Sequence, residues 1–183
     1  KLKDPGSTMS FEPLTEERIE TDSTYDAGTT TQLMWGARSD VGCVRPHNED
    51  SYLVQSPLFC VCDGMGGHAA GEVASSIAVE TIAKTAPQSA DAARLAAAVE
   101  AANAAVIEAA LNGLGKPGMG CTATCAYIEN DTLAIAHVGD SRAYLLHEGT
   151  LIRVTRDHSY VEELVDAGEI TADEARVHPN RSV

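Results

Sequence analysis

Two short acidic segments hold the residues of this sequence that are best suited to chemistry. The first contains Arg45, Glu49 and Asp50, and the second places Asp63 directly before Gly64 in a glycine-rich turn. Hard divalent cations such as Mg²⁺ and Mn²⁺ prefer oxygen ligands, and arginine makes planar, two-pronged hydrogen bonds to phosphate. Carboxylates beside one arginine therefore indicate metal-assisted chemistry on a phosphate group.

The order and spacing of four motifs resemble those of the bacterial type 2C metal-dependent Ser/Thr protein phosphatases. The resemblance runs from Leu33 to Val183 and continues through Asp157-His158-Ser159. Each motif is short, but four such motifs rarely occur together in this order and spacing by chance. The motifs are Arg45-x-x-Asn48-Glu49-Asp50, Asp63-Gly64-Met65-Gly66-Gly67-His68-x-x-Gly71-Glu72, Met119-Gly120-Cys121-Thr122 and Gly139-Asp140-Ser141-Arg142.

The resemblance implies a metal site with two catalytic ions, Mn²⁺ or Mg²⁺, and a weaker third. Glu49 and Asp63 would be direct ligands, Asp63 would bridge the two ions, and the carbonyl of Gly64 would complete one ligand set. Asp140 resembles the acid that binds the third ion in bacterial members. An aspartate that caps a turn between strands is the competing interpretation of Asp140.

Two further residues are assigned catalytic roles by the resemblance. Arg45 would hold the substrate phosphate, with a surface salt bridge as the alternative. Asp50 would orient metal-bound waters, because groups behind the ligands tune their basicity and geometry.

The general acid stays unassigned. Imidazole titrates near neutral pH, which makes His47, His68 and His158 candidates. Eukaryotic members place a histidine directly after the Asp-Gly pair, whereas Met65 stands there in this sequence. The acid role is therefore not carried over. A histidine at the helix start or behind the metal ligands is the preferred interpretation of His68, and His47 and His158 have no stronger claim to the acid role.

The family completes its metal site with two further aspartates, in an Asp-Gly motif and a late Asp-Asn motif. Neither motif occurs between Asp140 and Val183. We therefore expect the chain to represent the N-terminal two-thirds of a phosphatase domain and to be inactive by itself.

The leading hypothesis is a cytoplasmic protein-serine/threonine phosphatase in which a metal-activated water attacks a phosphoserine or phosphothreonine of a protein substrate. That substrate would be the product of a Ser/Thr kinase. A non-catalytic phosphoprotein-binding or scaffold module with a partial metal site is the alternative. The presence or absence of the late aspartates would decide between the two.

Composition narrows the possible partners and the compartment. The net charge of −14 argues against nucleic acid, because affinity for nucleic acid comes largely from Lys and Arg. No segment approaches the roughly 20 apolar residues that span a bilayer. Five cysteines without a secretory signal indicate reduced thiols in the cytoplasm. For Cys60 and Cys62, burial is favoured over a thiolate metal site, since soft sulfur suits hard ions poorly.

The hydrophobic patterns predict one α+β domain of antiparallel strands and helices. Residues 1–31 are interpreted as a cloning remnant before Met9 and a flexible N-terminal extension, and residues 32–183 as the partial phosphatase domain. The resemblance sharpens the fold to a β-sandwich of two antiparallel sheets flanked by helices, with residues 157–180 as a flap. Strands are expected near residues 29–35, 50–55, 58–63, 122–128, 133–138, 143–146 and 151–154, and helices near residues 70–86, 89–112, 161–168 and 171–178.

Overall fold

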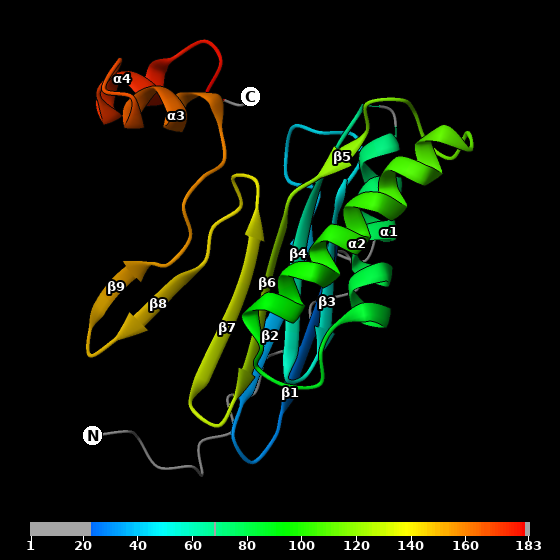
Figure 1. The fold of residues 1–183 in the computed structure, drawn as a ribbon, viewed down its shortest axis with the longest axis vertical. Helices are drawn as coiled ribbons and strands as arrows, with labels where there is room; N and C mark the ends of the chain where they lie inside the picture. The colour runs from blue at the N-terminus through cyan, green and yellow to red at the C-terminus, as the bar shows by residue number, and fades with distance from the viewer. Residues whose placement is uncertain (1–22, 68, 182–183) are drawn as a thin grey trace.

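The computed structural model describes residues 23–67 and 69–181, which form nine strands and four helices (Figure 1). The strands are β1 (Ser23–Thr29), β2 (Met34–Asp40), β3 (Asp50–Gln55), β4 (Leu58–Met65), β5 (Gly120–Cys121), β6 (Ala123–Glu129), β7 (Thr132–Val138), β8 (Tyr144–His147) and β9 (Thr150–Arg153). The helices are α1 (Ala70–Thr85), α2 (Ala92–Leu111), α3 (Tyr160–Asp166) and α4 (Ala172–Val177).

The largest sheet has the strand order β3-β4-β6-β7, with β5 paired to β4, and all of its pairings are antiparallel. Helices α1 and α2 cover one face of this sheet (Figure 1). Strand β4 shows why the sheet has an inner and an outer face. Leu58, Cys60 and Cys62 are buried on the helix side, while the alternating residues Val61 and Asp63 are exposed. The predicted α+β class with antiparallel strands is confirmed.

The two long helices pack closely because most of their buried residues are small. Ala74 and Ala78 of α1 and Ala98 and Ala102 of α2 are nearly inaccessible. Helix α1 ends at Thr85, before Pro87, as the sequence predicts. The start of α2 differs from the prediction.

The sequence predicts the start of this helix near residue 89, with Ser89 available as a cap, but α2 begins at Ala92. The N-cap is Asp91, whose side chain accepts a hydrogen bond from the backbone N–H of Arg94 at 3.0 Å. Aspartate and serine are comparably good N-caps, so residue type alone did not separate two positions that lie two residues apart.

The first strand contradicts the prediction that the chain is a flexible extension up to residue 31. Ser23–Thr29 forms β1 and pairs along its whole length with β2. Gly28 lies opposite Trp35, and a Cβ on Gly28 would come within 2.0 Å of the indole ring. The pairing depends on backbone hydrogen bonds and on the space that Gly28 leaves for the Trp35 ring. Neither feature produces the alternating apolar pattern by which a strand is predicted from sequence. Residues 1–22 of the predicted extension, which include the cloning remnant, lie outside the described residues.

The second layer differs in detail from the expected sandwich. Within the described residues, β1–β2 and β8–β9 are two separate hairpins rather than one sheet, and the β8–β9 hairpin stands to the side of the main sheet with its residues exposed (Figure 1). Trp35 of β2 packs edge-on against Phe59 of β4, with ring centroids 5.7 Å apart. Phe59 alternates with the helix-facing residues of β4, so the β1–β2 hairpin lies against the face opposite the helices.

The segment interpreted as a flap contains α3 and α4, which lie apart from the main sheet beyond the β8–β9 hairpin (Figure 1). The sequence Thr171-Ala172-Asp173-Glu174 is typical of a capping box, and at the start of α4 Thr171 and Glu174 exchange the expected hydrogen bonds. None of the helices among residues 23–67 and 69–181 combines the length and the apolar character that crossing a bilayer demands.

Candidate functional site

Three of the predicted acids come together where β3 and β4 are paired. Asp50 lies directly opposite Asp63 in the strand register. Burial raises the pKa of Asp63, and the negative charges of Asp50 and Asp140 raise it further, whereas Arg45 lowers it. The carboxyl groups are therefore close enough to repel one another. A divalent cation among them would relieve this repulsion.

A second group of predicted ligands meets at the start of α1. A Cβ built on Gly71 would lie 2.8 Å from the carboxyl carbon of Glu49 and 2.9 Å from the carbonyl oxygen of Gly64. The two candidate donors therefore flank the same glycine. A Cβ on Gly64 would itself come within 2.1 Å of the Gly71 carbonyl oxygen. Both positions exclude any side chain, because backbone and carboxylate occupy the space.

The backbone of Glu49 is fixed from two sides. Its carbonyl oxygen accepts hydrogen bonds from the Gly64 N–H at 3.1 Å and from the Ser75 hydroxyl at 2.7 Å. Ser75 is fully buried in α1 and also lies 2.9 Å from the hydroxyl of Ser51. This helix therefore positions a candidate ligand through one buried hydroxyl group.

Thr122 joins Asp63 to the turn that carries Asp140. The Thr122 hydroxyl accepts a hydrogen bond from the Asp63 N–H at 3.0 Å and lies 2.7 Å from the Ser141 hydroxyl. The Thr122 N–H donates to the Asp63 carbonyl at 2.8 Å. Gly139 packs against the same threonine, since a Cβ there would lie 2.6 Å from its methyl group.

Arg45 lies at the outer edge of the acids. Its guanidinium is 3.6 Å from the Glu49 carboxylate, and 71% of its side chain is exposed. The Glu49 side chain is only 14% exposed. Exposed ion pairs of this length contribute little free energy, so the guanidinium can exchange this contact for a phosphate group.

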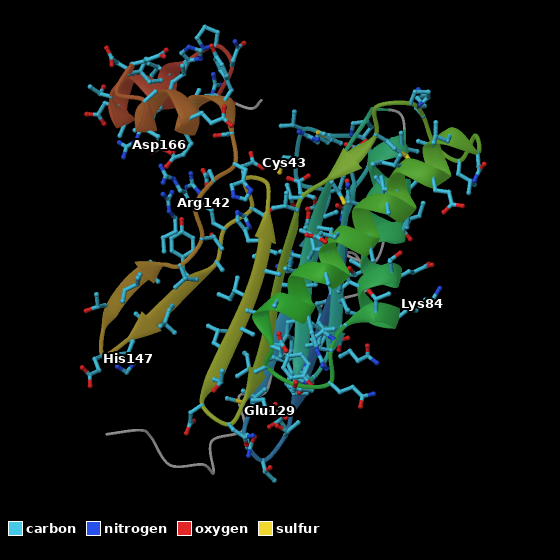
Figure 2. The ribbon with its side chains drawn as sticks, viewed as in Figure 1. Cys43, Lys84, Glu129, Arg142, His147 and Asp166 are labelled. Carbon is cyan, nitrogen blue, oxygen red and sulfur yellow. The ribbon has the colours of Figure 1, made fainter. Side chains whose placement is uncertain are left out.

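Asp140 is exposed and lines a cavity of about 510 Å³ between its turn and the flap. Beside it, Arg142 donates to both carboxylate oxygens of Asp157, through Nε at 2.9 Å and through a terminal nitrogen at 2.6 Å. This two-pronged pair lowers the pKa of Asp157 and raises that of Arg142. Arg142 braces the turn from the side of the flap, as Figure 2 shows.

The candidate histidines have separate positions. His47 is exposed in the loop before β3, and His68 lies outside the described residues. His158 accepts a hydrogen bond from the Gly139 N–H at 3.3 Å and lies against His137, with ring centroids 5.0 Å apart. These contacts give His158 a bracing position at the base of the flap.

Sequence reasoning assigned no role to Gly71, Ser75 or Thr122. Gly71 belongs to the motif that begins at Asp63, and a glycine inside a helix already indicates close packing. Ser75 carried no such signal, because a serine within an alanine-rich helix resembles any other small residue. Only the packing of α1 on β3 and β4 shows its partner.

The donor set suits a hard divalent ion. Glu49, Asp63 and the Gly64 carbonyl supply oxygen only, and Gly71 leaves the space in which two of them meet. Across residues 23–67 and 69–181, no three carboxylate, imidazole or thiol groups are gathered closely enough to hold an ion by themselves. Mg²⁺ commonly keeps several waters and takes only one or two carboxylates, so carbonyl and water ligands would complete its shell.

The described residues thus define an antiparallel α+β protein with an acidic, arginine-flanked site of the kind used in metal-assisted phosphate chemistry. Comparison with known families identifies this class: protein phosphatase 2C matches residues 35–164. The chain belongs to the protein phosphatase 2C family.

Named relatives come from several bacteria. The chain is 43% identical over 160 residues to the serine/threonine protein phosphatase PstP of Mycobacterium tuberculosis, an alignment that covers 86% of this chain and 31% of that protein. It is 38% identical over 158 residues to the serine/threonine phosphatase stp of Listeria welshimeri, which covers 80% of this chain and 63% of that protein.

Solved structures agree with this assignment. The crystal structure of Mycobacterium tuberculosis PstP/Ppp matches with a TM-score of 0.72 at 37% identity, covering 89% of this chain and 66% of that one. The catalytic domain of PstP in complex with two manganese ions matches with a TM-score of 0.68 at 37% identity, covering 85% and 64%. The chain therefore spans between 31% and 66% of the lengths of these relatives.

Proposed function

We propose that this chain supplies the phosphate-binding edge and one half of the metal site of a protein-serine/threonine phosphatase. The observation that carries the proposal is the meeting of Asp50, Asp63 and Asp140 with Arg45 at the end of one strand pair. Membership in the protein phosphatase 2C family and the likeness to bacterial serine/threonine phosphatases support the same activity. The activity of the whole protein is part of this proposal, because the chain spans between 31% and 66% of the lengths of its relatives.

Glu49, Asp63 and the Gly64 carbonyl are the residues that would hold the metal. Two Mn²⁺ or Mg²⁺ ions, when bound, would activate a water molecule and neutralise the phosphoryl oxygens. The manganese ions in the structure of the PstP catalytic domain support this cofactor. The carboxylates are fixed before a cation arrives, because the Glu49 backbone is held by Ser75 and the Asp63 backbone by Thr122.

Arg45 and Asp50 act on the substrate side. The exposed guanidinium of Arg45 would bind two oxygens of the phosphoryl group and orient it toward the acids. Asp50 lies opposite Asp63 and would accept hydrogen bonds from water at the site, which orients that water toward phosphorus. Water attack in this arrangement leaves no covalent phosphoenzyme.

Asp140 would bind a third, weaker ion at the edge of the flap. It is exposed, lies close enough to raise the pKa of Asp63, and belongs to a turn braced by Ser141 and Arg142. The substrates would be proteins phosphorylated by a Ser/Thr kinase, and the setting would be cytoplasmic signalling. The acidic chain, with its net charge of −14, favours such substrates over nucleic acid.

The test is Asp63→Asn in the full-length protein, assayed on a phosphothreonine peptide with Mn²⁺. Removal of one charge at the shared ligand should lower kcat by about 1,000-fold or more, in the range seen for loss of one essential electrostatic group. Asp131→Asn, in the turn between β6 and β7, is the matched control and should keep full activity.

Two results would count against the proposal. Full activity of Asp63→Asn at saturating Mn²⁺ would remove this residue from the metal site. A wild-type protein that binds the phosphopeptide but never releases phosphate would favour the non-catalytic module instead.

A further inference from the structure

Four of the five cysteines form a line of sulfur atoms between the main sheet and α1. Cys60 Sγ lies 2.8 Å from Cys125 Sγ and 3.8 Å from Cys62 Sγ. The thiols of Cys62 and Cys121 interact in turn, and Cys121 Sγ lies 3.8 Å from the Ala74 carbonyl oxygen of α1. All carry free thiols in the structure, and the proposed phosphatase chemistry uses none of them.

The pair formed by Cys60 and Cys125 is set by the strand register as well as by the side chains. The two residues lie directly opposite each other on antiparallel β4 and β6. Opposed residues on antiparallel strands have Cα atoms about 4.5 or 5.5 Å apart, and disulfides span Cα distances of about 4.4–6.8 Å. A disulfide across these strands therefore requires no change of register.

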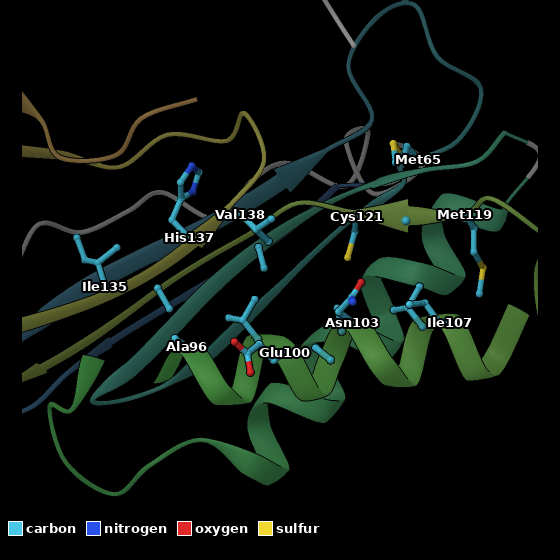
Figure 3. Close-up of a pocket in the computed structure, with 17 residues that line it drawn as sticks. Met65, Ala96, Glu100, Asn103, Ile107, Met119, Cys121, Ile135, His137 and Val138 are labelled. Atoms are coloured by element: carbon cyan, nitrogen blue, oxygen red, sulfur yellow. The ribbon is translucent and has the colours of Figure 1, made fainter. Parts of the chain in front are cut away.

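A cleft between α2 and the sheet lies next to this pair. The cleft encloses about 750 Å³, and Cys121, Ala123 and Ala136 are among its lining residues. Figure 3 shows the sulfur of Cys121 directed from the sheet toward the helices. Ala123 precedes Cys125 by two residues and Ala136 lies opposite it, so both share its face of the sheet. Cys125 does not line the cleft itself, but its neighbours on the same face of the sheet do.

We propose that Cys60 and Cys125 form an oxidative modification site, in which hydrogen peroxide entering the cleft converts the two thiols to a disulfide across β4 and β6. The Cys125 thiolate attacks one peroxide oxygen, the O–O bond breaks, and a sulfenic acid and water form. Cys60 then attacks the sulfenic sulfur, the S–S bond forms and a second water leaves. The two sulfurs lose two electrons to the peroxide, and both thiol protons end in the two waters.

The surroundings of the pair make this reaction slow and selective. Cys60 is 3% exposed and Cys125 is inaccessible, so larger oxidants are excluded. Hydrogen bonds to Cys125 and Cys62, together with burial, raise the pKa of the Cys60 thiol, which keeps it protonated and weakly nucleophilic at rest. Within the described residues the four thiols do not converge on a common point that could hold a metal ion.

The experiment treats the folded full-length protein with hydrogen peroxide, alkylates the remaining thiols, and maps the peptides by mass spectrometry without reduction. The expected product joins the peptides of Cys60 and Cys125, is lighter than the reduced pair by two hydrogen atoms, and disappears on reduction with dithiothreitol. The oxidised protein should unfold about 10 °C higher than the reduced protein, because the bond closes a long loop.

Two variants provide the controls. Cys125→Ala should form no such product and gain no thermal stability, whereas Cys43→Ala should behave as wild type, since Cys43 is exposed in the loop before β3 (Figure 2). A joined peptide of Cys62 and Cys121 in place of Cys60 and Cys125 would overturn the proposal. So would full alkylation of Cys60 and Cys125 after long exposure to peroxide, or a zinc or copper ion that co-purifies with the four thiols.

Discussion

Two regions of the molecule hold their functional groups by opposite means. The first, here called the corner, is the place beneath α1 where Glu49, Gly64, Gly71 and Ser75 meet, and the second is the flap of residues 157–180. In the corner, Glu49 and Gly64 are fixed by a glycine that leaves no spare space and by a hydroxyl with no solvent exposure. In the flap, Val161 is the one buried residue of α3, and α4 has none. Ion pairs such as Arg156 with Asp166 join the flap to the residues that precede it.

The difference shows where this protein can tolerate movement. In a closely packed region even a small change costs much free energy, because an added methyl group must displace backbone atoms or a carboxylate. Surface ion pairs contribute little and can exchange partners. Metal ligands need the close packing of the corner. A segment that contacts different protein substrates is better held by exchangeable surface ion pairs.

Amide hydrogen exchange compares the stability of the flap with that of the core strands directly, and we expect the largest difference in this measurement. Segments with few buried contacts open at low free energy, and core strands open only near global unfolding. We expect amides of residues 159–178 to exchange about 1,000-fold faster than those of residues 122–138 in the full-length protein, measured by mass spectrometry. Equal and strong protection in both segments would mean that the flap is a fixed part of the core.

Gly71→Ala should break the corner. The new methyl group would meet the Glu49 carboxyl carbon at 2.8 Å and the Gly64 backbone at about the same distance. We expect Mn²⁺ affinity, measured by calorimetry, to fall about 100-fold and the free energy of unfolding to fall by about 1–3 kcal/mol, although alanine favours helix.

Gly36→Ala is the matched control for this variant. Its nearest contact would be the Asp26 carbonyl oxygen at 3.9 Å, an ordinary distance. Unchanged Mn²⁺ affinity of Gly71→Ala would show that Glu49 does not depend on this packing.

Ser75→Ala should remove one hydrogen bond from the corner without adding a side chain that clashes there. The Glu49 carbonyl would lose its hydrogen bond at 2.7 Å and keep the one from Gly64. We expect a loss of about 1–2 kcal/mol in the free energy of unfolding and about 10-fold weaker Mn²⁺ binding. Ser76→Ala, one residue further along α1 and partly exposed, should change neither quantity. Equal behaviour of the two variants would leave Ser75 with a packing role only.

The smallest effect should come from the ion pair at the base of the flap. Arg142 lowers the pKa of Asp157 below its usual 3.8, so the pair stabilises the fold fully at pH values above 3.8 and this contribution is lost as pH falls through the lowered pKa. Because Arg142 is 46% exposed, we expect no more than about 1 kcal/mol.

The measurement compares the Tm of wild type and Asp157→Asn from pH 7 down to pH values below 3.8. The two proteins should differ at neutral pH and converge in acid. Asp173→Asn is the control, because that carboxylate is 89% exposed and should show no such convergence. A difference that grows toward acid pH would contradict the assigned role of Asp157.

Local patterns determined much of the fold. The alternation along β4, the apolar spacing of α1 and α2, and the capping box at Thr171 each depend on residues near one another in the chain. For that reason the sequence alone predicted most strands and helices to within a few residues. Strand β1 was missed because its pairing with β2 depends on backbone hydrogen bonds and on Gly28 making room for Trp35.

The candidate site divides in the same way. Residue types and spacing nominated Arg45, Glu49, Asp50 and Asp63, since hard oxygen donors beside an arginine are suited to few other chemistries. The resemblance to the type 2C phosphatases added Gly64 and Asp140. Only the tertiary structure decided which groups support them. Ser75, Thr122 and the thiols of Cys60 and Cys125 gain their partners from strands and helices distant in sequence. Such contacts are set by packing, and no local pattern records them.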